Sequence, residues 1–137
     1  MHESRIALLA AVAANVAGWL MPVVDDYLGW QAFRVALSPL WPFEQFRIEP
    51  GPLLVLSVAS ALTNLLFVVL GALLAARPQR YAKVVLWAAA GATLLNLHWP
   101  ISMGAQRAEL DNGYFVWVCS FALLALAAFL ARARARR

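Results

Sequence analysis

Charged residues are scarce in this sequence, and their scarcity excludes a water-soluble globular domain. Only 13% of the 137 residues are charged and 64% are hydrophobic. Soluble domains have about 25% charged and about 45–50% apolar residues. A single chain this apolar cannot cover its surface with polar side chains, so we expect an integral membrane protein.

Cysteine is almost absent as well. Cys119 is the single cysteine, so neither an intrachain disulfide nor a Cys-x-x-Cys redox pair can form. It lies within an apolar run, where a thiol stays protonated and unreactive. The sequence also has no metal-ligand spacing such as His-x-x-x-His and no evident set of nucleophile, base and oxyanion donor. We therefore expect neither an enzyme nor a bound cofactor or metal.

Four long apolar runs make up most of the chain. Each is long enough to cross a hydrocarbon core of about 30 Å as a helix that rises about 1.5 Å per residue. Turn signals such as Pro50-Gly51-Pro52 and Asp111-Asn112-Gly113 separate the runs. The sequence thus predicts an all-α integral membrane protein with a single domain, 1–137. Its four transmembrane helices are predicted at about 6–24, 53–76, 84–102 and 114–131.

Lysine and arginine are sorted unequally between the connections. One side carries Arg5, Arg77, Arg80, Lys83, Arg132, Arg134, Arg136 and Arg137, and the other carries Arg34, Arg47 and Arg107. Because basic connections stay in the cytoplasm, we expect both termini and the 77–83 loop there, in a bacterial inner (plasma) membrane. The opposite, outer side is acidic: it carries Asp25, Asp26, Glu44, Glu49, Glu109 and Asp111.

The outer loop 25–52 is the longest connection. Trp30, Phe33 and Leu37 recur at helical spacing, with polar residues such as Arg34 on another face. This pattern predicts a short amphipathic helix that lies in the membrane interface. The many aromatic residues of the loop form either an interfacial belt or a partner-binding surface. The predicted partner-binding residues are Asp25, Asp26, Trp30, Phe33, Arg34 and Trp41.

Uncharged polar residues interrupt the apolar runs, whereas no Asp, Glu, Lys or Arg does. The polar residues are Asn15, Ser57, Ser60, Asn64, Asn96, His98 and Ser120. The lack of ionisable carboxylates or amines disfavours ion-coupled transport, which needs them at depth. The polar residues have two interpretations: they bond the helices to one another, or they line a pocket open to the outside and ringed by Asp25, Asp26 and Asp111.

These features favour a protein that works by binding through its acidic, aromatic outer face. We expect its partners to be membrane lipids and another membrane or envelope protein. It would be an accessory subunit of an envelope complex or an immunity-type protein against a membrane-targeted toxin. The alternative is a homo-oligomeric transporter or flippase with a neutral polar path for a small solute or lipid.

A membrane enzyme, which would depend on His98 or Asp26, is a third class. Nucleic acid is not an expected partner, because the terminal arginines follow a hydrophobic segment as a membrane anchor does.

Overall fold

The structure, a computed structural model, describes residues 2–43, 51–104 and 109–134. Its elements are α1 (His2–Leu20), β1 (Pro22–Val24), β2 (Tyr27–Leu28), α2 (Gly29–Ala36), α3 (Pro52–Ala76), α4 (Pro78–Asn96), α5 (His98–Ser102) and α6 (Asn112–Arg134). The predicted all-helical class fits this fold. Three helical stretches are long and apolar enough to cross a membrane: Pro52–Ala76, Pro78–Ser102 and Asn112–Arg134. They indicate a membrane protein.

Parts of the predicted connections lie outside the described residues. They are 44–50 in the outer loop 25–52, then 105–108 and 135–137. The charged residues in these parts are Glu44, Arg47, Glu49, Arg107, Arg136 and Arg137.

The first helix ends earlier than the predicted range 6–24. α1 ends at Leu20, and strand β1 takes the place of the expected last turn. Pro22 has no amide hydrogen to continue the helical ladder, and Val24 pairs with Tyr27 in the neighbouring strand. Apolar residues alone do not distinguish a helix from a short strand, so the pattern could not reveal this end.

The third helix begins earlier than the predicted range 84–102. α4 begins at Pro78, whose fixed φ and missing amide hydrogen suit the first helical position. Of the basic residues expected in a loop at 77–83, Arg80 and Lys83 therefore lie on the first turns of α4, and Arg77 lies between α3 and α4. The helix is interrupted at Leu97, and the short α5 follows.

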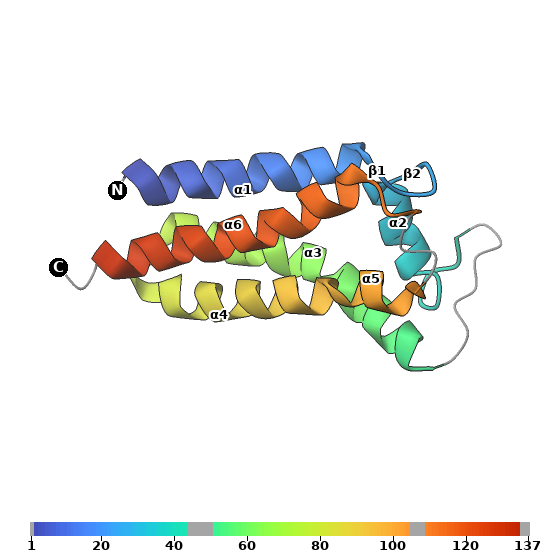
Figure 1. Ribbon diagram of the computed structural model, residues 1–137. Helices are drawn as coiled ribbons and strands as arrows, with labels where there is room; N and C mark the ends of the chain where they lie inside the picture. Colours follow the sequence, from blue (N-terminus) through green and yellow to red (C-terminus); the bar gives the residue numbers. More distant parts are fainter. Residues whose placement is uncertain (1, 44–50, 105–108, 135–137) are drawn as a thin grey trace.

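Small side chains form the interfaces between the long helices. α6 lies between α1 and α4 and packs on both, while α3 packs chiefly on α4 (Figure 1). The buried alanines of the core are Ala7, Ala11, Ala82, Ala89, Ala92, Ala127, Ala128 and Ala131. Small residues let backbones approach closely, which favours helix packing in lipid. Large apolar side chains point outwards instead: among them are Leu62, Leu65, Val68, Trp87, Leu94 and Phe129.

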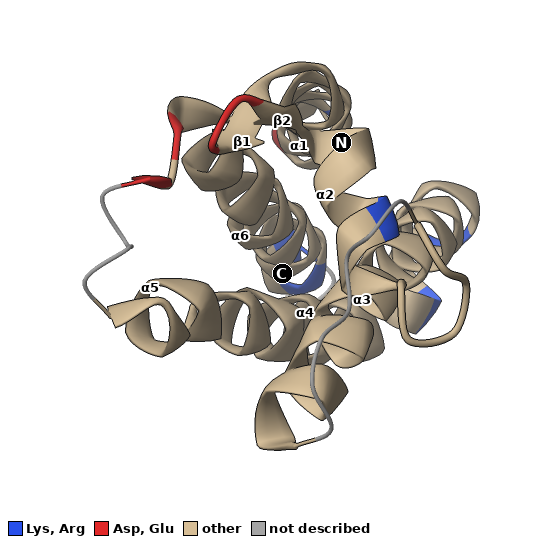
Figure 2. Ribbon diagram, turned by 90° about the vertical axis from the view of Figure 1, so that its right-hand side faces the viewer, with Lys and Arg blue, Asp and Glu red and all other residues tan. Residues whose placement is uncertain are grey.

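The bundle has two chemically different ends. We call the end with both termini and the α3–α4 connection the terminal end, and the opposite end, with the hairpin, α2 and α5, the loop end (Figure 1). The terminal end carries Arg5, Arg77, Arg80, Arg132 and Arg134. Figure 2 looks onto the loop end and shows acidic residues on the hairpin and on the segment before α6. The charge sorting predicted from the sequence is thus visible in the described part of the fold.

Strands β1 and β2 form an antiparallel hairpin at the loop end. Its turn residues Asp25 and Asp26 have φ of 46° and 65°, the left-handed values that match the twist of a tight hairpin. The Asp25 N–H donates to the Glu109 carbonyl at 3.2 Å, and the Asp111 N–H donates to the Val23 carbonyl at 3.1 Å. The hairpin is therefore fastened to the segment before α6, which brings four acidic residues together.

The amphipathic helix expected from the sequence corresponds to α2, directly after the hairpin. The Leu28 N–H donates to Gln31 Oε1 at 2.9 Å and so caps the start of the helix. At the other end the Leu37 N–H donates to the Phe33 carbonyl at 3.1 Å. α2 lies across the end of the bundle and contacts α1 and α3 (Figure 1).

Two glycines allow α1, α2 and α6 to meet closely. A Cβ atom on Gly18 would lie 2.7 Å from the Cβ atom of Trp117 in α6. A Cβ atom on Gly29, at the start of α2, would overlap the Gly18 carbonyl oxygen. Any larger residue at either position would push these elements apart.

Candidate functional site: an aromatic pocket at the loop end

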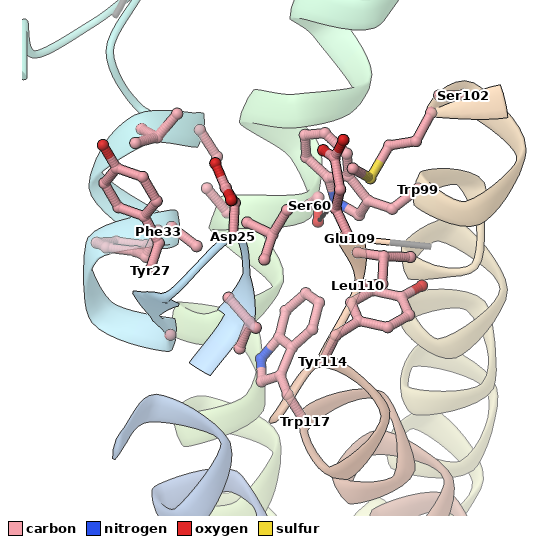
Figure 3. A pocket seen from close by; sticks show the side chains of 18 of the residues that line it. Asp25, Tyr27, Phe33, Ser60, Trp99, Ser102, Glu109, Leu110, Tyr114 and Trp117 are labelled. Atoms are coloured by element: carbon pink, nitrogen blue, oxygen red, sulfur yellow. Dashed lines mark hydrogen bonds between the residues drawn. The ribbon is translucent and has the colours of Figure 1, made fainter. Parts of the chain in front are cut away.

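A pocket opens at the loop end between the hairpin, α2, α3, α5 and the start of α6 (Figure 3). Its volume of about 410 Å³ falls within the range of about 300–1,000 Å³ that is common for small-molecule sites. Tyr114 and Trp117 lie in the lower part of Figure 3, and Tyr27 and Phe33 on one side face Trp99 on the other. The lining is mainly apolar, and aromatic rings make up much of it.

Asn64 joins three helices beside the pocket. Its Oδ1 accepts hydrogen bonds from the indole Nε1–H of Trp19 in α1, at 3.1 Å, and of Trp117 in α6, at 2.8 Å. Its Nδ2 donates to the Ala61 carbonyl at 3.1 Å. A polar group in lipid is costly unless it is bonded, so this arrangement holds both indoles in place. Two walls of the pocket are thereby fixed to α3.

A second group of hydrogen bonds joins α3 to α4 and α5. The Ser60 hydroxyl donates to Asn96 Oδ1 at 2.8 Å, and Asn96 Nδ2 donates to Thr63 Oγ1 at 3.1 Å. The Trp99 indole donates to Ser60 Oγ at 3.0 Å, and the Tyr114 hydroxyl donates to the Asn96 carbonyl at 2.7 Å. Two more rings of the lining are thus fixed by direct hydrogen bonds.

The other predicted polar residues are bonded away from the pocket. Asn15 Nδ2 donates to Ser120 Oγ at 3.0 Å and so joins α1 to α6. The Ser57 hydroxyl donates to a carbonyl of its own helix at 2.8 Å. His98 Nδ1 lies 2.7 Å from the carbonyl oxygen of Leu95, also on its own stretch of helix. Of the seven predicted polar residues, Ser60 and Asn64 are the two that line the pocket.

Two carboxylates are the charged groups of the described lining. Asp25 comes from the hairpin turn and Glu109 from the segment before α6, and both side chains are exposed. Both project into the upper part of the pocket in Figure 3. Asp26 and Asp111, which were also expected to ring the pocket, lie next to them but do not line it. The pocket is therefore apolar inside and acidic where it meets solvent.

The predicted partner-binding residues on and after α2 lie in two places. Phe33 lines the pocket, whereas Trp30 and Trp41 are exposed, with 43% and 59% of their surfaces accessible. The Arg34 guanidinium lies over the Trp41 ring, 3.7 Å from its centroid, and 5.1 Å from the centroid of Phe43. The structure thus separates a pocket-lining residue from an exposed Trp–Arg surface.

Sequence reasoning missed the tryptophans that build the pocket. Trp19, Trp99 and Trp117 are not among the predicted site residues, although each donates its indole N–H to a residue that is. A buried indole N–H usually finds an acceptor, so a tryptophan in an apolar run indicates that an amide or hydroxyl lies nearby. That signal was available from the sequence. Glu109 was noted only as one of several outer acidic residues.

Neither a search for metal-ligating groups nor a comparison with known proteins identifies a ligand for the site. Within 2–43, 51–104 and 109–134, no group of three or more His, Cys, Asp or Glu side chains could hold a metal ion. Comparisons of the chain with protein families, with curated proteins and with solved structures gave no match.

Proposed function

We propose that the chain is a four-span protein of the bacterial inner membrane, with both termini in the cytoplasm, that binds a small amphipathic molecule at its loop end. The pocket of about 410 Å³, walled by aromatic rings that hydrogen bonds hold in place, is the observation that carries this proposal. Such fixed apolar cavities with a few polar groups at the mouth are typical of ligand-binding sites.

The packing of α1 supports a fourth span. α1 runs antiparallel to α6 and packs along it, with Ala7, Ala11 and Gly18 buried at successive levels (Figure 1). Its opposite side exposes large apolar residues, among them Leu9 and Val16. A helix that packs along a spanning helix and exposes apolar side chains on its other side would cross the same layer of lipid.

The charge distribution supports the proposed orientation. Basic residues gather at the terminal end and acidic residues at the loop end (Figure 2). Basic flanks of membrane helices remain in the cytoplasm, so the pocket would open on the outer side. There α2, with Trp30 and Arg34, and the turn after it, with Trp41, would lie at headgroup depth.

The hydrogen bonds of the bundle favour binding over transport. Asn15, Asn64 and Asn96, which a neutral polar path would need, are bonded to residues of other helices. A binding role of this kind fits an accessory subunit of an envelope complex. The exposed Trp30 and Trp41 beside the pocket would then provide the contact with a protein partner.

Filling the pocket tests this function. Ala32 lines the pocket from α2, and a phenylalanine at this position would occupy part of the cavity. The wild type and Ala32→Phe are to be purified in native membrane discs and extracted with organic solvent. Mass spectrometry should detect a small amphiphile in the wild-type extract that is lost from the variant.

The matched control is Ala10→Phe, on the exposed side of α1 and remote from the pocket. This variant should retain the same bound molecule as the wild type. Identical extracts from the wild type and from Ala32→Phe would contradict the proposed function.

A further inference from the structure

We propose that the pocket selects an organic cation, with the apolar part of the ligand among the aromatic rings and its positive charge between the carboxylates of Asp25 and Glu109. This inference rests on the proposed function and adds the charge of the ligand to it. The chemical class is a hydrophobic ammonium or phosphonium ion.

The charges of the described lining have one sign. Asp25 and Glu109 approach each other through a backbone hydrogen bond of 3.2 Å, and no described lining residue is a lysine or an arginine. Asp26 and Asp111 lie next to Asp25 and Glu109 and add to the negative electrostatic potential at the mouth of the pocket. Arg34, the nearby basic residue on α2, is stacked on Trp41 rather than turned into the pocket.

The three indole donors of the lining, and the hydroxyls of Ser60 and Tyr114, are already in use. The indoles of Trp19 and Trp117 donate to Asn64, and the indole of Trp99 donates to Ser60. The hydroxyls of Ser60 and Tyr114 both donate to Asn96. An anion entering the pocket would meet these groups without a free proton to accept, and it would also meet two carboxylates.

Aromatic rings provide a further attraction for a cation. Trp19, Phe33, Trp99, Tyr114 and Trp117 line the cavity. The face of an aromatic ring carries partial negative charge and attracts a cation within about 6 Å, most strongly for tryptophan. A ligand that is both apolar and positively charged therefore suits the interior and the mouth of the pocket at once.

Two ions of the same shape and opposite charge test the inference. Tetraphenylphosphonium and tetraphenylborate are to be titrated calorimetrically into the protein in discs of zwitterionic lipid, with the heat of empty discs subtracted. Tetraphenylphosphonium should bind at least about tenfold more tightly than tetraphenylborate. Asp25→Asn and Glu109→Gln should each weaken its binding about two- to fivefold, since both carboxylates are exposed, and the double variant about four- to twentyfold.

Asp26→Asn is the matched control, because Asp26 lies in the same turn but outside the lining. It should change the dissociation constant by less than about twofold. Asparagine adopts the left-handed backbone of this turn readily, so neither turn variant should disturb the hairpin. Glu109→Gln alone is sufficient to test the charge if Asp25→Asn fails to fold.

The pocket-filling variants separate this inference from the proposed function. If tetraphenylborate binds as tightly as tetraphenylphosphonium, and Ala32→Phe or Ala61→Leu abolishes the binding of both, the pocket is a binding site and the preference for cations is wrong. If Ala32→Phe and Ala61→Leu leave the binding of both ions unchanged, the ions do not bind in the pocket. The proposed function then fails as well.

Discussion

Asn64 is the residue on which the walls of the pocket depend most. Replacing it with leucine leaves the indoles of Trp19 and Trp117 without their acceptor. Hydrogen bonds between membrane helices are worth about 0.6–1.7 kcal/mol each, so Asn64→Leu should lower the free energy of unfolding by about 1–3 kcal/mol. Reversible unfolding in mixed micelles measures this loss.

Ser57→Ala is the control for this change. The Ser57 hydroxyl bonds within its own helix, so its removal should alter the stability by less than about 0.5 kcal/mol. A double-mutant cycle of Asn64→Leu with Trp117→Phe should show a coupling energy of about 0.5–1.5 kcal/mol. Additive effects in that cycle, or an Asn64→Leu variant as stable as the wild type, would contradict the assigned role.

Single residues were predicted in part from the sequence. An amide in an apolar run must find a partner, which is why Asn64 and Asn96 could be identified. Their partners could not, because the rotation and tilt of each helix decide whether Trp19 or another residue meets Asn64. The same dependence explains why Ser60 lines the pocket while Ser57, one helical turn earlier, bonds within its own helix.

Among the elements, α1 and α6 are brought together by Gly18. Gly18→Ala would place a methyl group against Trp117, at distances that packed atoms do not reach. We expect it to reduce the free energy of unfolding by about 1–3 kcal/mol, as overpacked interfaces do.

Gly71→Ala is the matched control, since no atom of a neighbouring element lies within 4 Å of its added Cβ. It should be neutral or stabilise α3 by up to about 1 kcal/mol. Equal effects of the two changes would refute the close approach.

The exposed surface of α2 and the turn after it makes a separate prediction. Replacing both Trp30 and Trp41 with alanine should abolish co-purification of a protein partner from native membranes and leave membrane insertion intact. Trp87→Ala, which removes a tryptophan with 65% of its surface accessible from the side of α4, should retain the partner. If the partner remains bound after the double substitution, these residues serve as interfacial anchors only.

The elements differ in how well the sequence predicted them. Long apolar runs predicted α3 and α6 closely, because length and composition alone decide a spanning helix. The hairpin of β1 and β2 was missed for a physical reason. Its turn is Asp25-Asp26 rather than a glycine-containing pair, and β1 continues the apolar run of α1. Its pairing with Glu109 and Asp111 depends on the tertiary fold.

At the scale of the whole molecule, the two ends of the bundle differ in the side chains that line their openings. The proposed binding function depends on this difference. The opening at the terminal end, of about 810 Å³, has arginines and aliphatic side chains but no aromatic ring among its described lining residues. At the loop end the hairpin, α2, α3, α5 and the start of α6 border a space lined by aromatic rings. A ligand from outside the cell would reach that space only if the loop end faces outwards.

The direct test of this account is the labelling of single cysteines in intact cells. In a Cys119→Ser background, His2→Cys and Gln79→Cys probe the terminal end, and Asp26→Cys probes the turn of the hairpin. A membrane-impermeant maleimide should label Asp26→Cys in intact cells, and the other two variants only after the membrane is opened. Labelling of Gln79→Cys in intact cells, or of His2→Cys and Asp26→Cys from the same side, would contradict the four-span orientation and an outward-facing pocket.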